Sequence, residues 1–299
     1  MPVGLPGSGK STYIKNEYST KSDTVILSSD ALRIELGFLP GTHNDVVFNL
    51  MLKKSCESLK AGLNVVYDAT NLSRKNRISV LEKVRKYADS CECILFVVDP
   101  EICIKRDALR DPVAVVGPFV IDRMVKSFNV PMYCEGFDVI SVVVNDSCTH
   151  TLQEFLLQTK DFDQDNPHHT LSLYDHLQMT MQIVENANNG LLRDAALYHD
   201  IGKLWTKVYE NSKGEETTVA HYYGHENVGA YMYLIGVASI IKDFPALIDH
   251  HLYVAALINW HMRPYIEMNS TKREREYKML GEDFVDHLKI LHSSDVQAH

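Results

Sequence analysis

Short apolar runs rich in β-branched residues recur through the first half of the chain, at positions 25–27, 65–67, 94–98 and 139–144. Each run is flanked by segments with helical periodicity. Parallel strands buried beneath crossover helices have this pattern, because both of their faces are covered. The first half therefore predicts an α/β domain built on a parallel sheet.

The second half has helical periodicity, and we expect no regular strands there. Helices are predicted at 175–188, 191–199, 225–235, 247–261 and 272–298. The stretch 207–218 is expected to be a small hairpin or loop, and one more helix is predicted at 151–158. We place the domain boundary in the polar, acidic stretch 161–167. The prediction is an α/β domain at 1–160 followed by an all-α domain at 161–299.

The composition fits a packed globular protein of about two domains, since the 299 residues are 45% hydrophobic and 23% charged. The sequence shows neither an apolar run of membrane-spanning length nor a basic-then-apolar leader. We therefore expect a cytoplasmic protein with no membrane partner. The six cysteines show no CxxC spacing, which argues against a disulfide framework and a zinc ribbon.

Charge is distributed unevenly between the two halves. Residues 161–299 carry the entire net charge of −9 and 12 of the 14 histidines. This balance argues against a protein that coats nucleic acid without specificity. A half rich in both histidine and carboxylate residues is a candidate for a metal site.

Residues 4–12 read Gly-Leu-Pro-Gly-Ser-Gly-Lys-Ser-Thr and fit the P-loop pattern G-x-x-x-x-G-K-[ST]. In such a loop the backbone amides wrap the phosphates, the lysine reaches the β and γ oxygens, and the serine ligates Mg²⁺. We expect ATP or another nucleoside triphosphate to bind with Mg²⁺ through Gly7, Ser8, Gly9, Lys10, Ser11 and Thr12. Only three residues precede Gly4, so the strand before the loop is expected to be short.

A P-loop alone does not identify the phosphate acceptor. Asp30 and Arg33 lie one helical turn apart after the second apolar run, at the sheet edge where α/β proteins bind ligands. Asp30 could accept a proton from an attacking hydroxyl, and Arg33 could hold a phosphate of the acceptor. The alternative is a helix N-cap with a surface arginine. Arg106 and Arg110 could close over the transferred phosphoryl group, or each could be a solvated surface residue.

In their order along the chain, these motifs resemble the polynucleotide 5'-kinases, such as the kinase module of phage RNA-repair enzymes. The resemblance covers about residues 1–145 and includes the motifs Asp68-Ala69-Thr70-Asn71 and Asn129-Val130-Pro131. It implies that Asp30 is the general base for a 5'-hydroxyl, that Arg33 grips the neighbouring acceptor phosphate, and that Arg110 contacts the donor phosphates. Related small-molecule kinases share much of this pattern.

The second half contains an ordered set of potential metal ligands, namely His176, His199, Asp200 and Asp295. Neutral imidazole and carboxylate are ligands that divalent cations take. The order H…HD…D resembles the HD phosphohydrolase superfamily, an all-α metal-dependent fold, over about residues 168–299. The resemblance implies one or two divalent transition metals, from Mn²⁺, Ni²⁺, Co²⁺, Fe²⁺ or Zn²⁺.

The same resemblance implies that His225 and His261 complete a second metal site, with His250 or His251 as alternatives. Asp200, adjacent to His199 and anionic, would be the catalytic residue that bridges two ions. Lys203 could steady a substrate phosphate, or it could be a surface cation at the end of a helix.

Together the two resemblances imply an enzyme that heals RNA ends: an ATP-dependent 5'-hydroxyl polynucleotide kinase joined to a hydrolase of 2',3'-cyclic phosphate or 3'-phosphate. RNA or DNA ends would be its substrates, and a separate RNA ligase could join the healed ends. Two alternatives stay open. One is a small-molecule or nucleotide kinase fused to a nucleotide phosphohydrolase, and the other is a nucleotide-gated sensor without turnover. A sensor needs neither a base nor a complete ligand set.

Overall fold

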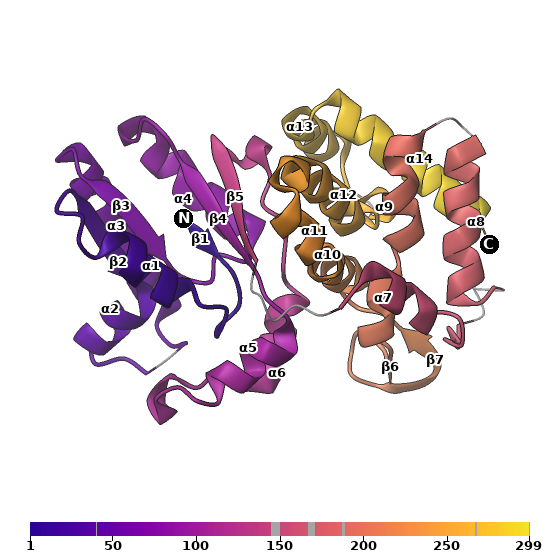
Figure 1. Ribbon diagram of the computed structural model, residues 1–299, viewed down its shortest axis with the longest axis horizontal. Helices are drawn as coiled ribbons and strands as arrows, with labels where there is room; N and C mark the ends of the chain where they lie inside the picture. The colour runs from indigo at the N-terminus through magenta and orange to yellow at the C-terminus, as the bar shows by residue number, and fades with distance from the viewer. Residues whose placement is uncertain (40, 145–149, 167–170, 187–188, 267, 299) are drawn as a thin grey trace. The chain divides into compact units, whose positions relative to one another are not determined.

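The computed structural model describes residues 1–39, 41–144, 150–166, 171–186, 189–266 and 268–298. These form two compact units. Unit 1 comprises Met1–Val125 and Pro131–Cys148, and unit 2 comprises Lys126–Val130 and Thr149–His299 (Figure 1). The sequence places the boundary near residue 160, whereas the helix α7 (Leu152–Gln158) packs on helix α10 (His225–Gly236) within unit 2.

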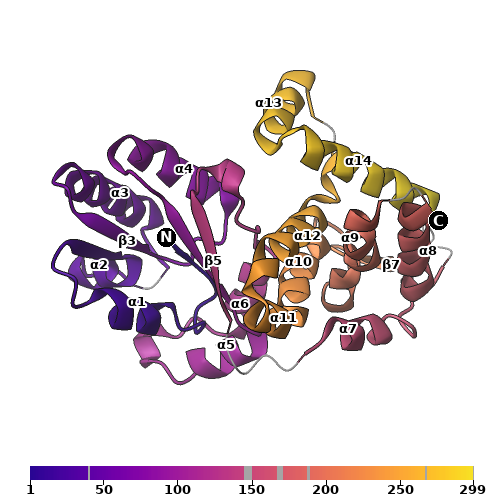
Figure 2. The same cartoon turned by 45° about the horizontal axis from the view of Figure 1, so that its top comes forward.

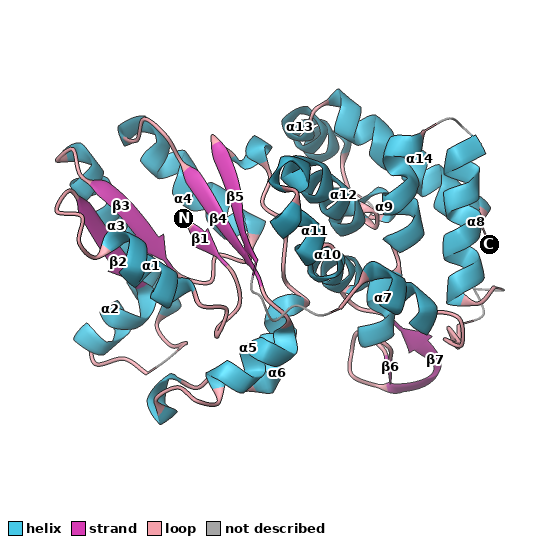
Figure 3. Cartoon of the chain, viewed as in Figure 1, coloured by secondary structure: helices cyan, strands magenta, loops and turns pink. Residues whose placement is uncertain are grey.

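Unit 1 is an α/β domain with parallel strands, as the apolar runs predict. Its strands are β1 (Pro2–Val3), β2 (Thr24–Ser28), β3 (Asn64–Asp68), β4 (Glu92–Val97) and β5 (Val139–Val144). One sheet has the order β1-β4-β5 and the other pairs β2 with β3, and every pairing is parallel. The strands are drawn in magenta in Figure 3.

The helices of unit 1 cover these strands, as expected for buried parallel strands. They are α1 (Lys10–Tyr18), α2 (Ser29–Glu35), α3 (Asn44–Lys60), α4 (Arg74–Val84), α5 (Pro100–Asp107) and α6 (Pro118–Val125). Three short 3₁₀ segments lie at Arg85–Tyr87, Pro112–Ala114 and Tyr133–Glu135. A core cluster of Leu27, Leu32, Val47, Met51 and Tyr67 joins α2 and α3 to β2 and β3.

Strand β1 has two residues, in agreement with the short strand expected from the sequence. β1 pairs with β4, and a side chain that follows β3 links β1 to β3. The Asn71 amide donates to the Pro2 carbonyl at 2.8 Å and to the Tyr67 carbonyl at 3.1 Å. The Gly4 amide donates to the Thr70 carbonyl at 3.0 Å. The P-loop is therefore fixed to the carboxyl end of β3 directly after β1 ends.

Unit 2 is mainly helical. Besides α7 and α10, its helices are α8 (Leu173–Asn186), α9 (Arg193–Tyr198), α11 (Ala238–Asp243), α12 (Ile248–Trp260), α13 (Ser270–Leu280) and α14 (Glu282–Gln297). The 3₁₀ segments are η4 (Gly190–Leu192), η5 (Ile201–Trp205), η6 (Pro245–Leu247) and η7 (Arg263–Tyr265). Helices α10 and α12 pack side by side, and α14 packs against α8 (Figure 2).

An antiparallel hairpin of β6 (Val208–Glu210) and β7 (Glu216–His221) interrupts the helices, as the hairpin or loop predicted at 207–218 allows, and it extends to His221. One detail of unit 2 differs from the sequence prediction. The helix predicted at 272–298 is two helices, because Gly281 lies between them at φ +88° and ψ 154°, a conformation that side chains disfavour. The predicted helix 175–188 extends to residues 187 and 188, which lie outside the described residues.

None of the helices in the described ranges has the length and apolarity needed to cross a bilayer.

Candidate functional site

The P-loop of unit 1 has a backbone that glycine makes possible. Gly7 has a φ of +76°, and a Cβ at this position would lie 2.4 Å from the Cys103 carbonyl oxygen. Gly9 has a φ of +92° and caps the N-terminus of α1. The loop thus turns sharply against α5 and leads into a helix whose N-terminal amides and dipole favour anions.

Lys10 is buried at the start of α1 and holds the loop from inside. Its ammonium donates to the Gly4 carbonyl at 2.9 Å and to the Leu5 carbonyl at 2.7 Å. Burial lowers the pKa of Lys10 to about 8, against the opposing effect of the Asp68 carboxylate. Ser8 is also buried, whereas Ser11 and Thr12 are exposed on the first turn of α1.

Asp30 lies between two arginines at the carboxyl end of β2. Its Oδ1 accepts from Arg33 Nη1 at 3.1 Å, and its Oδ2 lies 3.7 Å from Arg110 Nη2. The Asp30 side chain is 65% exposed, whereas the Arg33 side chain is 7% exposed. The structure therefore brings together three residues that the sequence selected, with the carboxylate open to solvent. Arg33 is a buried residue and not the surface arginine of the alternative reading.

Arg106 does not join this group. Among the described residues its side chain makes no hydrogen bond or ion pair, and the residue lies half-buried on α5. The sequence analysis instead missed Asp107, which is 1% exposed. Its carboxylate accepts from Arg110 at 3.1 Å and from the amides of Val116 and Gly117 at 3.0 and 2.9 Å. Asp107 thus fixes both Arg110 and the connection to α6. An acid three residues before an arginine, at the end of the predicted helix, was the available indication.

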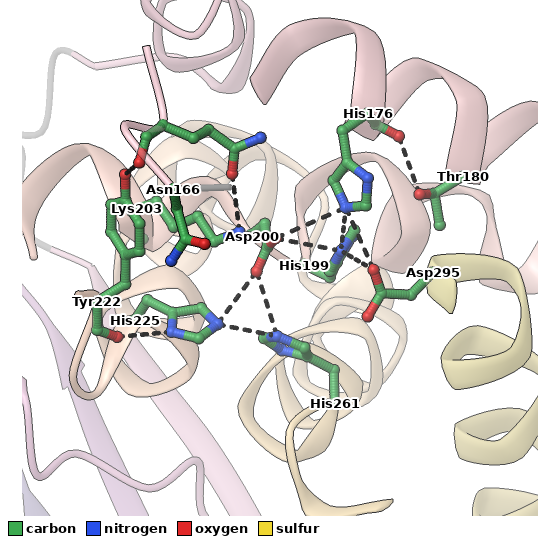
Figure 4. Close-up of polar contacts among 12 residues, drawn as sticks. Asn166, His176, Thr180, His199, Asp200, Lys203, Tyr222, His225, His261 and Asp295 are labelled. Carbon is green, nitrogen blue, oxygen red and sulfur yellow. Dashed lines mark hydrogen bonds and ion pairs between the residues drawn. The ribbon is translucent and has the colours of Figure 1, made fainter. Parts of the chain in front are cut away.

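Six side chains converge in the interior of unit 2 (Figure 4). His176 lies on α8, His225 begins α10, Asp295 lies on α14, and His199, Asp200 and His261 follow the ends of α9 and α12. All six are buried. The structure therefore brings together the six candidate metal ligands of the first and second predicted sites.

The Nδ1 atom of each histidine in this cluster is hydrogen-bonded to a backbone carbonyl. The acceptors are Ala298 at 3.2 Å for His176, Ala196 at 2.9 Å for His199, Tyr222 at 2.7 Å for His225, and Ile258 at 2.7 Å for His261. A carbonyl can only accept, so the arrangement favours Nδ1–H and leaves the Nε2 lone pair facing inward. Histidines that bind metals are usually oriented in this way.

The inward atoms form two groups that share Asp200. In the first group, His176 Nε2 and His199 Nε2 lie 3.6 Å from Asp200 Oδ2, and 3.2 and 3.4 Å from Asp295 Oδ1. In the second group, His225 Nε2 and His261 Nε2 lie 3.1 and 3.4 Å from Asp200 Oδ1. One carboxylate thus offers one oxygen to each group.

The spacing of these atoms fits ligands around a cation. His176 Nε2 lies 3.2 Å from His199 Nε2, and His225 Nε2 lies 3.2 Å from His261 Nε2. Two lone pairs facing each other repel unless a proton or a metal lies between them. Ligands bound to one ion at about 2.0–2.2 Å are separated by roughly 3.0–3.5 Å, which matches both pairs. The residues therefore fit one divalent metal in each group.

The electrostatics of the cluster attract positive charge. Burial by itself would lower the pKa of His199, but Asp200 and Asp295 outweigh burial and raise this pKa to about 9. Burial opposes ionisation of Asp200 too, yet Lys203 and His199 hold its pKa well below the usual range. Without a metal, the two carboxylates thus draw protons and a lysine into the interior.

Three neighbours that the sequence analysis missed, or left undecided, orient these carboxylates. Lys203 is buried, with Nζ 2.6 Å from Asp200 Oδ2, so it is not a surface cation. Gln164 Oε1 accepts from the same Nζ at 2.9 Å. The Tyr265 hydroxyl donates to Asp295 Oδ2 at 2.6 Å, which leaves Oδ1 for the histidines. No spacing rule selects Gln164 or Tyr265, because they come from distant segments of the chain that only the fold brings near.

The alternative histidines lie elsewhere. The Tyr233 hydroxyl and His251 Nδ1 are hydrogen-bonded at 2.9 Å, and His250 is exposed. Among the described residues, the groups able to hold a metal are His176, His199 and Asp200, and Asp200, His225 and His261. The Asn129-Val130 part of the kinase motif belongs to unit 2, where Asn259 Oδ1 accepts from the Val130 amide at 3.2 Å.

A family model described as an AAA domain matches residues 1–131, which contain the P-loop, Asp30, Arg33 and Arg110. No curated protein matches the chain. The matched segment belongs to a P-loop kinase-like α/β fold, and the six residues of the metal-ligand cluster lie outside it.

Proposed function

We propose that the chain is a bifunctional enzyme that heals nucleic-acid ends, with RNA ends as the expected substrate. Unit 1 would phosphorylate a 5'-hydroxyl with ATP, and unit 2 would hydrolyse a 2',3'-cyclic phosphate or a 3'-phosphate. One observation carries the proposal: four histidine Nε2 atoms converge on the two oxygens of Asp200, in a chain that also holds a P-loop and the Asp30–Arg33 pair.

The residues of unit 1 supply the parts of a phosphoryl transfer. Asp30, exposed beside Arg33 and Arg110, would take the proton of the attacking hydroxyl. As the hydroxyl oxygen bonds to the γ-phosphorus, the bond from that phosphorus to the β–γ bridging oxygen breaks, and ADP leaves. Lys10 would turn from the Gly4 and Leu5 carbonyls to the phosphate oxygens, and Ser11 would ligate Mg²⁺.

The second arginine of this group would act on the donor. Arg110 is 32% exposed and is anchored by the buried Asp107 carboxylate, so its guanidinium can reach a phosphate while one Nη stays fixed. Arg33 is more constrained. Its hydrogen bonds to Asp30, Thr42 and Asn44 use three N–H groups, and the remaining two are available for an acceptor phosphate.

The residues of unit 2 suit a phosphoester hydrolase. His176, His199, Asp200 and Asp295 would hold one ion, and Asp200, His225 and His261 a second. Bound divalent ions would supply neutralisation of the phosphoryl oxygens and an activated water. Lys203, buried beside Asp200 and oriented by Gln164, places a further positive charge at the centre. Such an arrangement has no use in a protein that only binds a nucleotide.

A single incubation tests both activities. The substrate is an oligoribonucleotide with a 5'-hydroxyl and a 2',3'-cyclic phosphate, supplied with ATP, Mg²⁺ and, in separate tubes, Mn²⁺, Ni²⁺, Co²⁺, Fe²⁺ or Zn²⁺. We expect a 5'-phosphate in every tube, and loss of the 3'-terminal phosphate to depend on the second metal. Free nucleosides provide the control. Preferential phosphorylation of nucleosides would support a small-molecule kinase, and failure to change either end would overturn the proposal.

A further inference from the structure

The loop between α2 and α3 presents an aromatic surface next to the Asp30–Arg33 pair. The rings of Phe38 and His43 are stacked, with centroids 4.0 Å apart and planes inclined by 14°. Phe38 is half-buried and packs on the core cluster of unit 1, whereas His43 is exposed. We call these two rings the Phe38–His43 platform. Phe38 covers one face of the imidazole, the His43 Nδ1 atom lies 3.1 Å from the Thr42 hydroxyl oxygen, and the His43 residue as a whole is exposed.

The backbone of His43 is held in a costly conformation. His43 has φ +50° and ψ +39° in the left-handed region, where a residue with a Cβ is disfavoured. It precedes α3, yet its side chain does not cap that helix. The stacked ring is thus presented outward at a cost that capping does not offset. Strain of this kind concentrates where a protein positions a group for binding or catalysis.

Arg33 connects the platform to the candidate general base. Arg33 Nε donates to the Thr42 carbonyl at 3.3 Å, and Nη2 donates to Asn44 Oδ1 at 2.7 Å, so the guanidinium grips the residues on both sides of His43. Its Nη1 donates to Asp30 Oδ1 at 3.1 Å. One rigid group therefore fixes the distance between the Asp30 carboxylate and the exposed ring.

One apolar side chain lies exposed near Asp30 and its two arginines. Ile34 lies one turn after Asp30 on the same face of α2, and its side chain is 79% exposed. A nucleoside presents a hydroxyl at one end and a flat π surface at the other. Stacking on aromatic side chains recognises any base, because every base has a π face.

We propose that the Phe38–His43 platform stacks the base of the 5'-terminal nucleoside whose hydroxyl faces Asp30. The proposal rests on the kinase part of the proposed function and adds the nucleobase as a recognised group of the acceptor. It makes the acceptor site selective for nucleosides in a polynucleotide over sugar alcohols of similar size. It requires no preference among the bases.

The test compares two oligonucleotides that differ only in the first residue, which carries a base in one and is abasic in the other. The wild type is expected to use the abasic oligonucleotide with a kcat/KM lower by about tenfold, the loss typical of one base stack. His43→Asn removes the ring but suits the left-handed backbone, and it should use both oligonucleotides equally, at the low rate. His43→Phe keeps a stacking ring and should restore the difference. The KM for ATP should stay within about twofold throughout.

A measurement without catalysis completes the test. His43→Trp places a fluorophore in the platform, and a 5'-hydroxyl oligonucleotide should quench it more strongly than the abasic one. Equal use of both oligonucleotides by the wild type, with equal quenching in His43→Trp, would overturn the platform and leave the kinase activity standing. Failure of the wild type to phosphorylate any oligonucleotide would overturn the kinase part of the proposed function and the platform with it.

Discussion

The two polar centres of this chain differ in how much of each is assembled by the protein alone. In unit 2, six ligating side chains are buried, and each histidine is fixed by a backbone carbonyl. In unit 1, Asp30 is 65% exposed and Ser11 lies on the surface. The Lys10 ammonium, which is expected to bind the phosphates of a nucleotide, donates instead to a carbonyl of the P-loop. A buried centre has to be built before its ions arrive, because unpaired polar groups are costly there. An exposed centre can be completed by its substrates.

The largest expected effect removes the residue common to both metal groups. Asp200→Ala should abolish 3'-end hydrolysis and release both ions, since each group loses a ligand and the cluster loses its shared negative charge. His261→Ala should remove one ion and leave a weaker enzyme. Elemental analysis of the purified proteins measures the metal content. The control is His250→Ala, at an exposed residue of α12, the helix that ends directly before His261. One ion per chain in the wild type would contradict the two-group assignment.

Loss of the candidate base should affect only unit 1. Asp30→Asn removes the proton acceptor and is expected to lower the rate of 5'-phosphorylation by about 100-fold or more, with 3'-end hydrolysis within about twofold of the wild type. End-labelling assays on one preparation measure both rates. Glu35→Gln, an exposed acid on the same helix, should change neither. Parallel loss of both activities in folded Asp30→Asn would show that the two centres do not work separately.

A smaller effect tests how far orientation of the ligands matters in unit 2. Tyr265→Phe deletes the hydroxyl that donates to Asp295 Oδ2. We expect the affinity of the first group for its ion to fall by about 10- to 100-fold, as it usually does when such a hydrogen-bond partner is lost. The ion of the second group should be unaffected. Competition with a chromophoric chelator gives the two affinities. Tyr253→Phe is the matched control, since Tyr253 pairs with His287 away from the cluster. The same weakening in both variants would make the Tyr265 contact irrelevant to the metal.

The smallest expected effect is a pH dependence in unit 1. Burial lowers the pKa of Lys10 to about 8, so the free protein loses this charge as the pH rises through 8. Bound phosphates favour the charged form, and nucleotide binding then has to take up a proton. ATP affinity should be constant below pH 8 and fall by at most about tenfold per pH unit above it. Calorimetry at pH 7, 8 and 9 measures this, and Lys10→Arg should show no such fall. A flat profile in the wild type would contradict the assignment.

The sequence predicts the elements of unit 1 well, because β-branched runs covered on both faces leave a distinct pattern. The sequence-based predictions fail where tertiary contacts decide the structure. The packing of α7 on α10 moves the boundary of unit 2, and the backbone of Gly281 breaks the last helix. The candidate metal ligands can be selected because their residue types and order are unusual. Asp107, Gln164 and Tyr265 cannot be selected in the same way, because each acts through a partner that the fold brings near.

The join between β1 and β3 has a consequence for the motions of the P-loop. Amide protons in a regular ladder exchange with solvent only when several neighbouring bonds open together. At this join the Asn71 side chain bonds to the Pro2 and Tyr67 carbonyls, and the Gly4 amide bonds to Thr70 just beyond a strand of two residues. Rotation of Asn71 alone removes its own bonds and leaves the Gly4–Thr70 bond and the pairing of β1 with β4 in place. Because only a few bonds hold the start of the P-loop, its amides should exchange with solvent through local opening and not through global unfolding.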